Sequence, residues 1–292
     1  MTTQNLRRVA IVVLVFNLLL ASYGISRHRQ ARLKVTFLDV GQGDCAVIET
    51  PGGRVVLVDT GGTGPFGDRD EGKKTVEPYL RHEGVGHIDA ILLTHPHSDH
   101  IGGADTLLRD MAVDMLLDNG EPTQPALEQK LLGDAAQRNV PCLHALRGER
   151  IDLGDGVAME VLGPTTDEVE DDRPNNCSIV VRLSYGRNVF LFTGDAEKRE
   201  EQDLLAVRYR LKCDVLKVGH HGSDTSSTDE FIKACSPREA VVSVGAHNSY
   251  GHPSDDVISR LKRAGAHVDR TDKAGAVTCY SDGETVEVNT MR

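Results

Sequence analysis

Four side chains that can bind a metal ion lie within six residues of one another: His95, His97, Asp99 and His100. They follow an apolar run at residues 88–93 that is typical of a buried strand. Because His95 and His97 are two residues apart, extended backbone would project both imidazoles to the same side. The turn therefore offers two nitrogen ligands to one cation, and a carboxylate with a further nitrogen to a second. Such a set suits a divalent ion such as zinc, and favours a metal site over a His-rich surface loop.

The chain has 292 residues and a formal net charge of −11, enough length for one large domain or two small ones. Residues 1–34 contain only basic charges, so the remainder is more acidic than the whole. An acidic body does not attract polyanions through its general field. This counts against a tight, non-specific DNA-binding protein but not against a nuclease.

Residues 9–25 are largely apolar, with Arg7 and Arg8 before them and Arg27 and Arg29 after them. This length is the lower limit for a membrane-spanning helix. A signal peptide cleaved near residues 22–24, which would give a secreted protein, is the alternative. We favour an uncleaved single-pass anchor in residues 1–32, which attaches residues 33–292 to the cell membrane. Because basic residues flank both ends of this segment, the positive-inside rule does not decide on which side of the membrane residues 33–292 lie. We expect this domain outside the cytoplasm.

The elements that would position the metal turn fall into two β-rich blocks, each followed by helices. Strand-like runs at residues 34–40, 45–50 and 54–59 precede helix-like runs at 104–111 and 126–137. A hairpin at residues 178–183 and 188–193 precedes alternating helices and strands. The pattern predicts two stacked sheets with helices on their outer faces. The six cysteines show no C-x-x-C spacing, so we interpret them as small buried hydrophobic residues.

The metal turn, together with VDTG at 58–61 and TGD at 193–195, resembles the metallo-β-lactamase superfamily. Further segments resemble the hydrolase domain of ComEC-type competence proteins: FLDVGQGD at 37–44, NNCS at 175–178, KVGHHGS at 217–223 and YGHPS at 250–254. The resemblance runs from about residue 33 to the C-terminus. It implies an αββα sandwich with a dinuclear metal site. The multi-helix membrane channel of that family has no counterpart in these residues, so DNA translocation is not implied.

By this resemblance, His95 and His97 bind the first ion, Asp99 and His100 the second, and Asp195 bridges the two. One of His220 and His221 should complete the second site, and His220 is favoured. Neighbours at an extended strand end point in opposite directions, so His221 would then face the substrate or support a ligand.

Many superfamily members have a histidine about 20 residues before the bridging aspartate, where this chain has Asn175 and Asn176, as ComEC-type proteins do. An amide binds zinc more weakly than an imidazole, so the first site could accept manganese. Asn175 would either donate to a substrate oxygen or form a structural Asx turn.

Asp59 resembles the acid that orients a ligand histidine. Asp39 and Asp44 lie in a glycine-rich turn and are candidates to support the site, as is Ser223. His252 could protonate a leaving group or contact phosphate. The catalytic candidates are therefore Asp99, His221, His252 and Asn175.

Two divalent ions about 3.5–4 Å apart would lower the pKa of water towards about 7 and make hydroxide available. We expect zinc, with manganese as the alternative. The first hypothesis is a membrane-tethered phosphodiesterase or nuclease acting on single-stranded DNA. The second is a hydrolase of small phosphodiesters, such as phosphocholine esters, or of esters and lactones. The third is a non-catalytic, metal-stabilised module of a competence or envelope assembly; the sequence indicates no protein partner.

Overall fold

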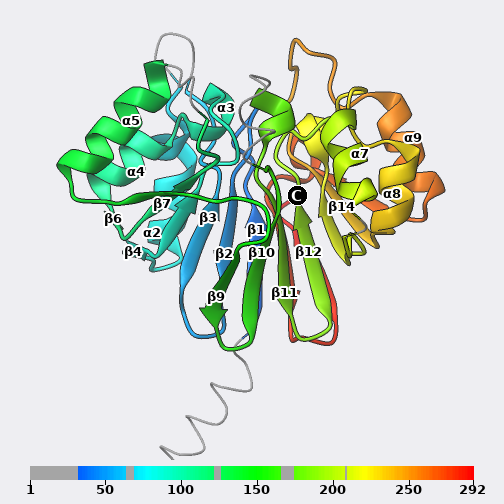
Figure 1. The fold of residues 1–292 in the computed structure, drawn as a ribbon, viewed down its shortest axis with the longest axis horizontal. Coiled ribbons are helices and arrows are strands. Elements are labelled where there is room, and N and C mark those ends of the chain that lie inside the picture. The colour runs from blue at the N-terminus through cyan, green and yellow to red at the C-terminus, as the bar shows by residue number, and fades with distance from the viewer. Residues whose placement is uncertain (1–31, 64–68, 122–125, 166–173, 208) are drawn as a thin grey trace, which may run out of the picture.

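The computed structural model describes residues 32–63, 69–121, 126–165, 174–207 and 209–292. Two β-sheets are stacked face to face, with helices on both outer faces, as Figure 1 shows. The αββα sandwich predicted from the sequence is therefore confirmed. The predicted anchor at residues 9–25 lies outside the described residues. Among those that are described, no helix has both the length and the apolar character needed to cross a membrane.

The first sheet has eight strands. It begins with an antiparallel edge and becomes parallel from β3 onward. Its spatial order is β17 (Val286–Thr290), β16 (Val277–Ser281), β1 (Leu33–Phe37), β2 (Ala46–Glu49), β3 (Val55–Val58), β5 (Ala90–Leu92), β7 (Leu116–Asp118) and β8 (Cys142–His144). A separate parallel pair joins β4 (His87–Ile88) and β6 (Ala112–Val113).

The second sheet has seven strands and is parallel from β12 to β15. Its order is β15 (His267–Arg270), β14 (Glu239–Val242), β13 (Val215–Lys217), β12 (Asn188–Phe192), β11 (Val180–Tyr185), β10 (Val157–Gly163) and β9 (Arg150–Gly154). Because β3, β5, β12 and β13 all run in the same sense towards the loops that carry the metal-competent residues, those loops gather at one end of the sandwich.

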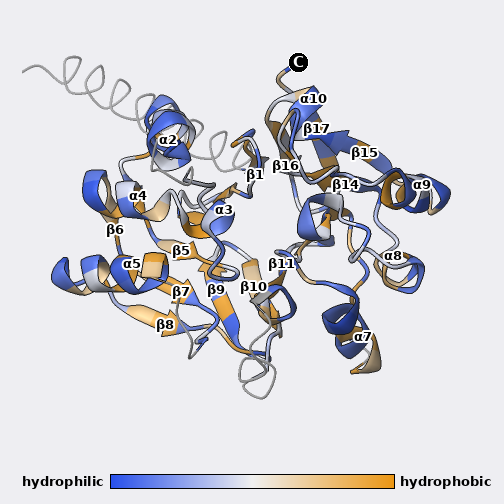
Figure 2. Cartoon of the chain, turned by 90° about the horizontal axis from the view of Figure 1, so that it is seen from above, coloured by the Kyte–Doolittle hydropathy of each residue, from blue (hydrophilic) through white to orange (hydrophobic). Residues whose placement is uncertain are grey.

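Three apolar layers hold the sandwich together. The central layer lies between the sheets, where the rings of Phe37 and Phe192 are 5.8 Å apart. Burial of one such ring stabilises the fold by about 1.5–3 kcal/mol. The outer layers lie beneath the helices. Figure 2 shows hydrophobic residues along β5 and β7 and hydrophilic residues on much of α2, α8 and α9. Each helix thus turns its apolar stripe to a sheet and its polar face to water.

The helices over the first sheet are a π-helical turn (Gly72–Val76) that continues into α2 (Glu77–His82), then α4 (Ala104–Asp110) and α5 (Ala126–Gln137). Those over the second are α7 (Lys198–Ala206), α8 (Asp229–Cys235) and α9 (Asp255–Arg263). Short helical segments occupy the connections: α3 (Ser98–Ile101), 3-10 turns at Pro174–Cys177 and Gly219–Gly222, and α10 (Thr271–Ala274). Thr228 and Ser254 cap α8 and α9, each accepting a backbone N–H through its hydroxyl oxygen.

Candidate metal centre

The predicted metal turn leaves the first sheet directly after β5 and folds into the short helix α3. The loop between β1 and β2 lies against it, and Asp44 N–H donates to the carbonyl oxygen of Asp99 (3.1 Å). Gly43 has φ of 147°, and a Cβ there would collide with that same carbonyl. Glycine is therefore needed at this position so that the two loops can approach closely.

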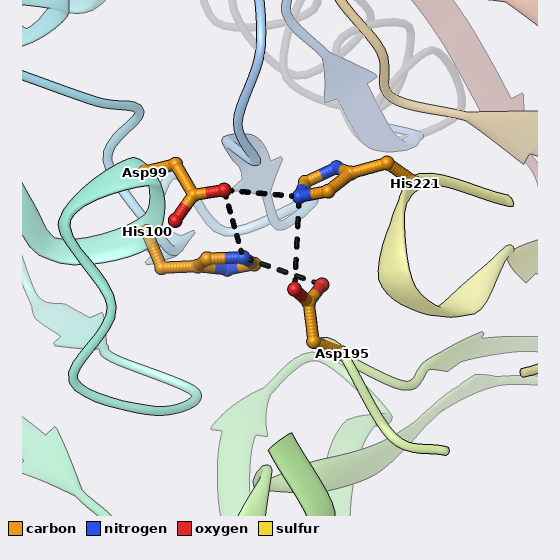
Figure 3. A group of neighbouring side chains, drawn as sticks. All are labelled: Asp99, His100, Asp195 and His221. Carbon is orange, nitrogen blue, oxygen red and sulfur yellow. Dashed lines mark hydrogen bonds and ion pairs between the residues drawn. The ribbon is translucent and has the colours of Figure 1, made fainter. Parts of the chain in front are cut away.

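Four donor side chains from both sheets meet in one cluster, here called the four-residue cluster: Asp99, His100, Asp195 and His221. Figure 3 shows them pointing toward one another. His221 Nε2 lies 3.2 Å from Asp99 Oδ2 and 3.7 Å from Asp195 Oδ2. His100 Nε2 lies 3.3 Å from Asp195 Oδ1 and 4.0 Å from Asp99 Oδ2. Ligands about 2.0–2.1 Å from a tetrahedral zinc ion are separated by about 3.4 Å, so this spacing fits one ion.

A second group, the three-residue cluster, contains His95, His97 and Asp195. His95 Nε2 lies 2.9 Å from His97 Nδ1 and 3.8 Å from Asp195 Oδ2. His95 is buried, whereas His97 is exposed at the surface. Asp195 therefore belongs to both clusters, which is the position that the sequence analysis assigned to the bridging carboxylate.

The buried histidines are held by hydrogen bonds on the ring side that faces away from the clusters. His100 Nδ1 donates to Asp59 Oδ2 (2.8 Å), and His221 Nδ1 donates to the carbonyl oxygen of Ser243 (2.9 Å). Asp59 is itself held by Thr94, whose backbone N–H and hydroxyl both donate to it (2.8 Å each). With Nδ1 protonated, each Nε2 presents a lone pair to the cluster, as in metal-binding histidines. The hydrogen bond from His100 to Asp59 is the geometry that the orienting role predicted for Asp59 requires.

Two cluster atoms face each other at 3.3 Å without a hydrogen bond to any described residue: His100 Nε2 and Asp195 Oδ1, both buried. Buried polar atoms in folded proteins almost always have a partner. A divalent cation would satisfy both atoms at once, so the residues present fit a metal ion.

The charges of the metal-free centre differ between the clusters. Burial alone would lower the pKa of His100 and His221, but the carboxylates around them, led by Asp195, outweigh it. The pKa of His100 is raised well above its usual value, and that of His221 to about 10. Burial and the neighbouring His100 instead lower the pKa of His95. In the metal-free four-residue cluster the two protonated histidines therefore offset the two carboxylates, and an incoming cation must displace their protons.

A buried ion pair supports the four-residue cluster from below. Lys217 Nζ contacts Asp44 Oδ2, and both side chains are almost fully buried. Asp44 Oδ1 lies 3.5 Å from His221 Nδ1, while Lys217 Nζ donates to the carbonyl oxygen of Gly194 (3.3 Å), the residue before Asp195. Burial would raise the pKa of Asp44, but Lys217 and His221 lower it. The Asp44–Lys217 pair therefore contacts His221 directly and Asp195 through the backbone of the preceding residue.

The structure places His221 in the four-residue cluster, where the sequence analysis favoured His220. That analysis assumed extended backbone after β13, whereas His220 and His221 both have left-handed conformations, with φ of 47° and 53°. His220 is less buried than His221, with Nε2 3.7 Å from Asp195 Oδ2 and Nδ1 3.2 Å from Glu197 Oε1. The two histidines thus occupy the opposite places from those expected, with His221 in the four-residue cluster and His220 outside it.

His220, His252 and Tyr250 lie next to one another on the less buried side of the metal centre. The rings of His220 and His252 are 5.6 Å apart, and Tyr250 stacks on His252 at 5.8 Å. Burial and the two neighbouring histidines lower the pKa of His252. Asn248 fixes this loop, because its side chain bonds the backbone N–H and carbonyl of His252 (3.0 and 2.7 Å). Tyr250 is 68% exposed, so much of its ring faces solvent.

Three other candidates lie further from the donor atoms. Asn175 donates to Glu197 Oε1 (3.5 Å), so it reaches His220 only through that carboxylate. Ser223 bonds the hydroxyl of Thr225, which also contacts His220. Asp39 accepts from the N–H of Gly41 (3.4 Å) and lies 3.6 Å from Arg292. It contacts no cluster residue within the described chain, so of the two aspartates in its loop only Asp44 reaches the centre.

Sequence reasoning missed Lys217, Glu197 and Tyr250. Lys217 could have been found from the sequence, because it ends an apolar strand and a lysine buried there needs a charged partner. Glu197 had none, because only the folded chain brings it to His220 and to the asparagines.

Comparison with known proteins agrees with this geometry. The model of the "Metallo-beta-lactamase superfamily" matches residues 38–247. ComE operon protein 3 of Bacillus subtilis is 36% identical over 84% of this chain and 32% of its own length. Recombination protein 2 of Haemophilus influenzae is 30% identical over 97% of this chain and 32% of its own length. The chain thus spans about a third of these relatives.

Among solved structures, the metallo-beta-lactamase fold protein YhfI from Bacillus subtilis is similar with a TM-score of 0.56 and 12% identity. The match covers 85% of this chain and all of that one. At this identity the similarity concerns the fold alone.

Proposed function

The chain belongs to the metallo-beta-lactamase superfamily, and from that premise we propose that it is a metal-dependent phosphodiesterase that cleaves single-stranded DNA at a membrane. The observation that carries the hydrolase proposal is the pair of donor clusters joined by Asp195. The name of one relative, Recombination protein 2, supports a nucleic-acid substrate over a lactam or thioester, and the exposed Tyr250 supports it as well. Attachment through residues 9–25, with the domain outside the cytoplasm, is part of the proposal.

The four-residue cluster would hold one divalent ion, and His95, His97 and Asp195 would hold the other. When bound, two such ions supply charge stabilisation for a reacting phosphate and lower the pKa of water towards about 7. Zinc fits the mixture of nitrogen and oxygen donors, and the three-residue cluster, with fewer protein ligands, could also accept manganese.

The partly exposed histidines His220 and His252 would bind and protonate the substrate. Glu197 and Thr225 orient His220 through Nδ1, and Nε2, 3.7 Å from Asp195 Oδ2, would then face a phosphate held at the clusters. His220 would pass its proton to the leaving oxygen. His252 is neutral at pH 7 because its pKa is lowered, so its role would be an N–H hydrogen bond to a phosphate oxygen.

The Tyr250 ring offers a surface on which a base can stack. It is exposed, and the ring of His252 supports it from one side at an interplanar angle of 14°. Stacking of a base on an aromatic ring contributes about 1–3 kcal/mol without selecting a sequence. A single strand that binds here by stacking does not need electrostatic attraction from the protein surface, which the net negative charge of the chain would not supply.

The test follows cleavage of end-labelled single-stranded DNA by the full-length protein in a non-ionic detergent, with added zinc or manganese. We expect cleavage that is lost in His97→Ala and retained in His82→Ala, which removes an exposed histidine of α2. Absence of cleavage by a protein that binds two ions would refute the nuclease and redirect the search to small phosphodiesters and esters. Absence of bound ions would refute the hydrolase.

A further inference from the structure

A basic cavity of about 610 Å³ lies at the end of the second sheet opposite to the metal clusters. It is lined by five cationic side chains: Arg182, Arg187, Arg210, Lys212 and Arg238. Arg187 directly precedes β12, Lys212 lies shortly before β13 and Arg238 directly precedes β14, whereas Asp195 and His221 follow β12 and β13. Because these strands are parallel, the cavity and the clusters occupy opposite ends of the sheet (Figure 1). A phosphate held in this cavity is therefore not the one that is hydrolysed.

The lining of the basic cavity is strongly positive, with five cationic side chains and one carboxylate, Asp214. Arg182, Arg210, Lys212 and Arg238 form no ion pair with any described residue, and Arg187 pairs only with the exposed Glu284, at 3.4 Å. The lining also contains Asp214, but its Oδ2 accepts the backbone N–H of Val189 (2.9 Å). Such a concentration of like charge is unfavourable without an anion.

Arg182 gives a second, independent indication of a ligand. It projects from the middle of β11, and its Nε is buried without a hydrogen-bond partner in the described chain. A buried donor left without a partner destabilises the fold. An anionic oxygen in the cavity would accept from it, and guanidinium groups match the geometry of phosphate.

The chain enters the domain at this same end. Leu33, the first residue of β1, pairs with Ser281, whose hydroxyl donates to Asn188 beside Arg187 (2.7 Å). Arg187 N–H also donates to the carbonyl oxygen of Gly283 (2.6 Å), so the turns of the two sheets pack together here. The apolar residues 9–25 therefore precede, by a few residues rich in arginine, the end that carries the basic cavity.

We propose that the basic cavity binds the phosphate headgroups of anionic phospholipids and turns the metal centre away from the membrane. Basic groups next to a membrane segment are attracted to an anionic lipid surface. The acidic remainder of the body would be repelled by that surface, so the cavity selects one orientation. The proposal uses the anchor only to choose lipid over other phosphates, and it does not depend on hydrolase activity.

Hydrogen exchange of the full-length protein tests this with preformed vesicles of phosphatidylcholine alone or mixed equally with phosphatidylglycerol. We expect at least about tenfold slower exchange at residues 209–214 and 236–239 with the anionic vesicles. The protection should be lost in Arg210→Glu/Lys212→Glu. It should persist in Lys262→Glu/Arg263→Glu, which makes the same charge change on the exposed end of α9. Unchanged exchange in β12 and β13 shows that each variant is folded.

Equal exchange with both kinds of vesicle, or protection that survives Arg210→Glu/Lys212→Glu, would overturn the proposal. Two further samples contain phosphatidylcholine vesicles with either inorganic phosphate or a single-stranded oligonucleotide. If either one protects these segments as strongly as phosphatidylglycerol does, the cavity is a free-phosphate or nucleic-acid site, and the lipid assignment is wrong.

Discussion

The four-residue and three-residue clusters share Asp195 but differ in how firmly the fold holds their other members. In the four-residue cluster, His100 and His221 are buried, bonded through Nδ1 to Asp59 and Ser243, and supported by the Asp44–Lys217 pair. In the three-residue cluster one of the two histidines, His97, is exposed, and Asp195 is the only carboxylate. Preorganised ligands bind a metal more tightly because less ordering is needed on binding. The comparison teaches that the two sites should differ in affinity although they lie within one centre.

The largest effect should come from the residue that the clusters share. Asp195→Ala removes a ligand from both, so we expect both ions to be lost and metal-dependent turnover to disappear. The affinity should fall by more than the roughly 10–100-fold that removal of an outer supporting residue costs. Metal content by mass spectrometry measures this, with Asp39→Ala as the matched control, since Asp39 contacts no cluster residue within the described chain. Retention of two ions in Asp195→Ala would contradict the shared-ligand geometry.

The adjacent histidines should separate metal binding from turnover. His221→Ala should release the ion of the four-residue cluster and leave one ion per chain. His220→Ala should keep two ions but slow turnover by about 10²–10⁴-fold, as loss of a proton donor does. Metal stoichiometry and single-turnover rates on the two variants distinguish them. The opposite pattern would restore His220 as the ligand.

Removal of the buried support should weaken only one cluster. Asp44→Asn leaves Lys217 buried without its counter-ion, so we expect the free energy of unfolding to fall by about 3–5 kcal/mol. The affinity of the four-residue cluster should fall while that of the three-residue cluster stays. Denaturant unfolding and zinc titration measure the two effects. Asp44→Asn/Lys217→Met, which removes both charges, should recover much of the stability; a double variant no more stable than the single one would argue against the pair.

The smallest effect is a difference in pH dependence. In the metal-free protein the pKa of His221 is about 10, so at pH 7 a metal must displace its proton. The affinity of the four-residue cluster should therefore rise by about tenfold per pH unit and per proton displaced between pH 7 and 9. The pKa values of His95 and His97 are lowered, so both are already neutral and their cluster should change little.

Chelator-buffered zinc titrations can read each cluster alone. His97→Ala isolates the four-residue cluster and His221→Ala isolates the three-residue cluster. If zinc affinity rose equally with pH in the two variants, the difference in histidine protonation between the clusters would be refuted.

Much of the fold was predictable because its periodic segments are long enough to carry a pattern. Helix α5 was expected at residues 126–137 and is found at Ala126–Gln137. Strands β8, β9 and β15 were not expected. They lie at or near sheet edges and are partly exposed, so they lack an apolar alternation. Only pairing with a neighbouring strand makes them strands.

Sequence alone determined the donor set of the metal turn and, through resemblance, Asp195, because ligand type and close spacing are properties of a short segment. Tertiary structure decided which of His220 and His221 joins the four-residue cluster, since that depends on two left-handed residues that no local pattern announced. It also decided that Lys217 would pair with Asp44, and that five cations scattered between residues 182 and 238 would line one cavity. Those side chains come from separate strands and loops, and only the packing of the second sheet and its helices brings them together.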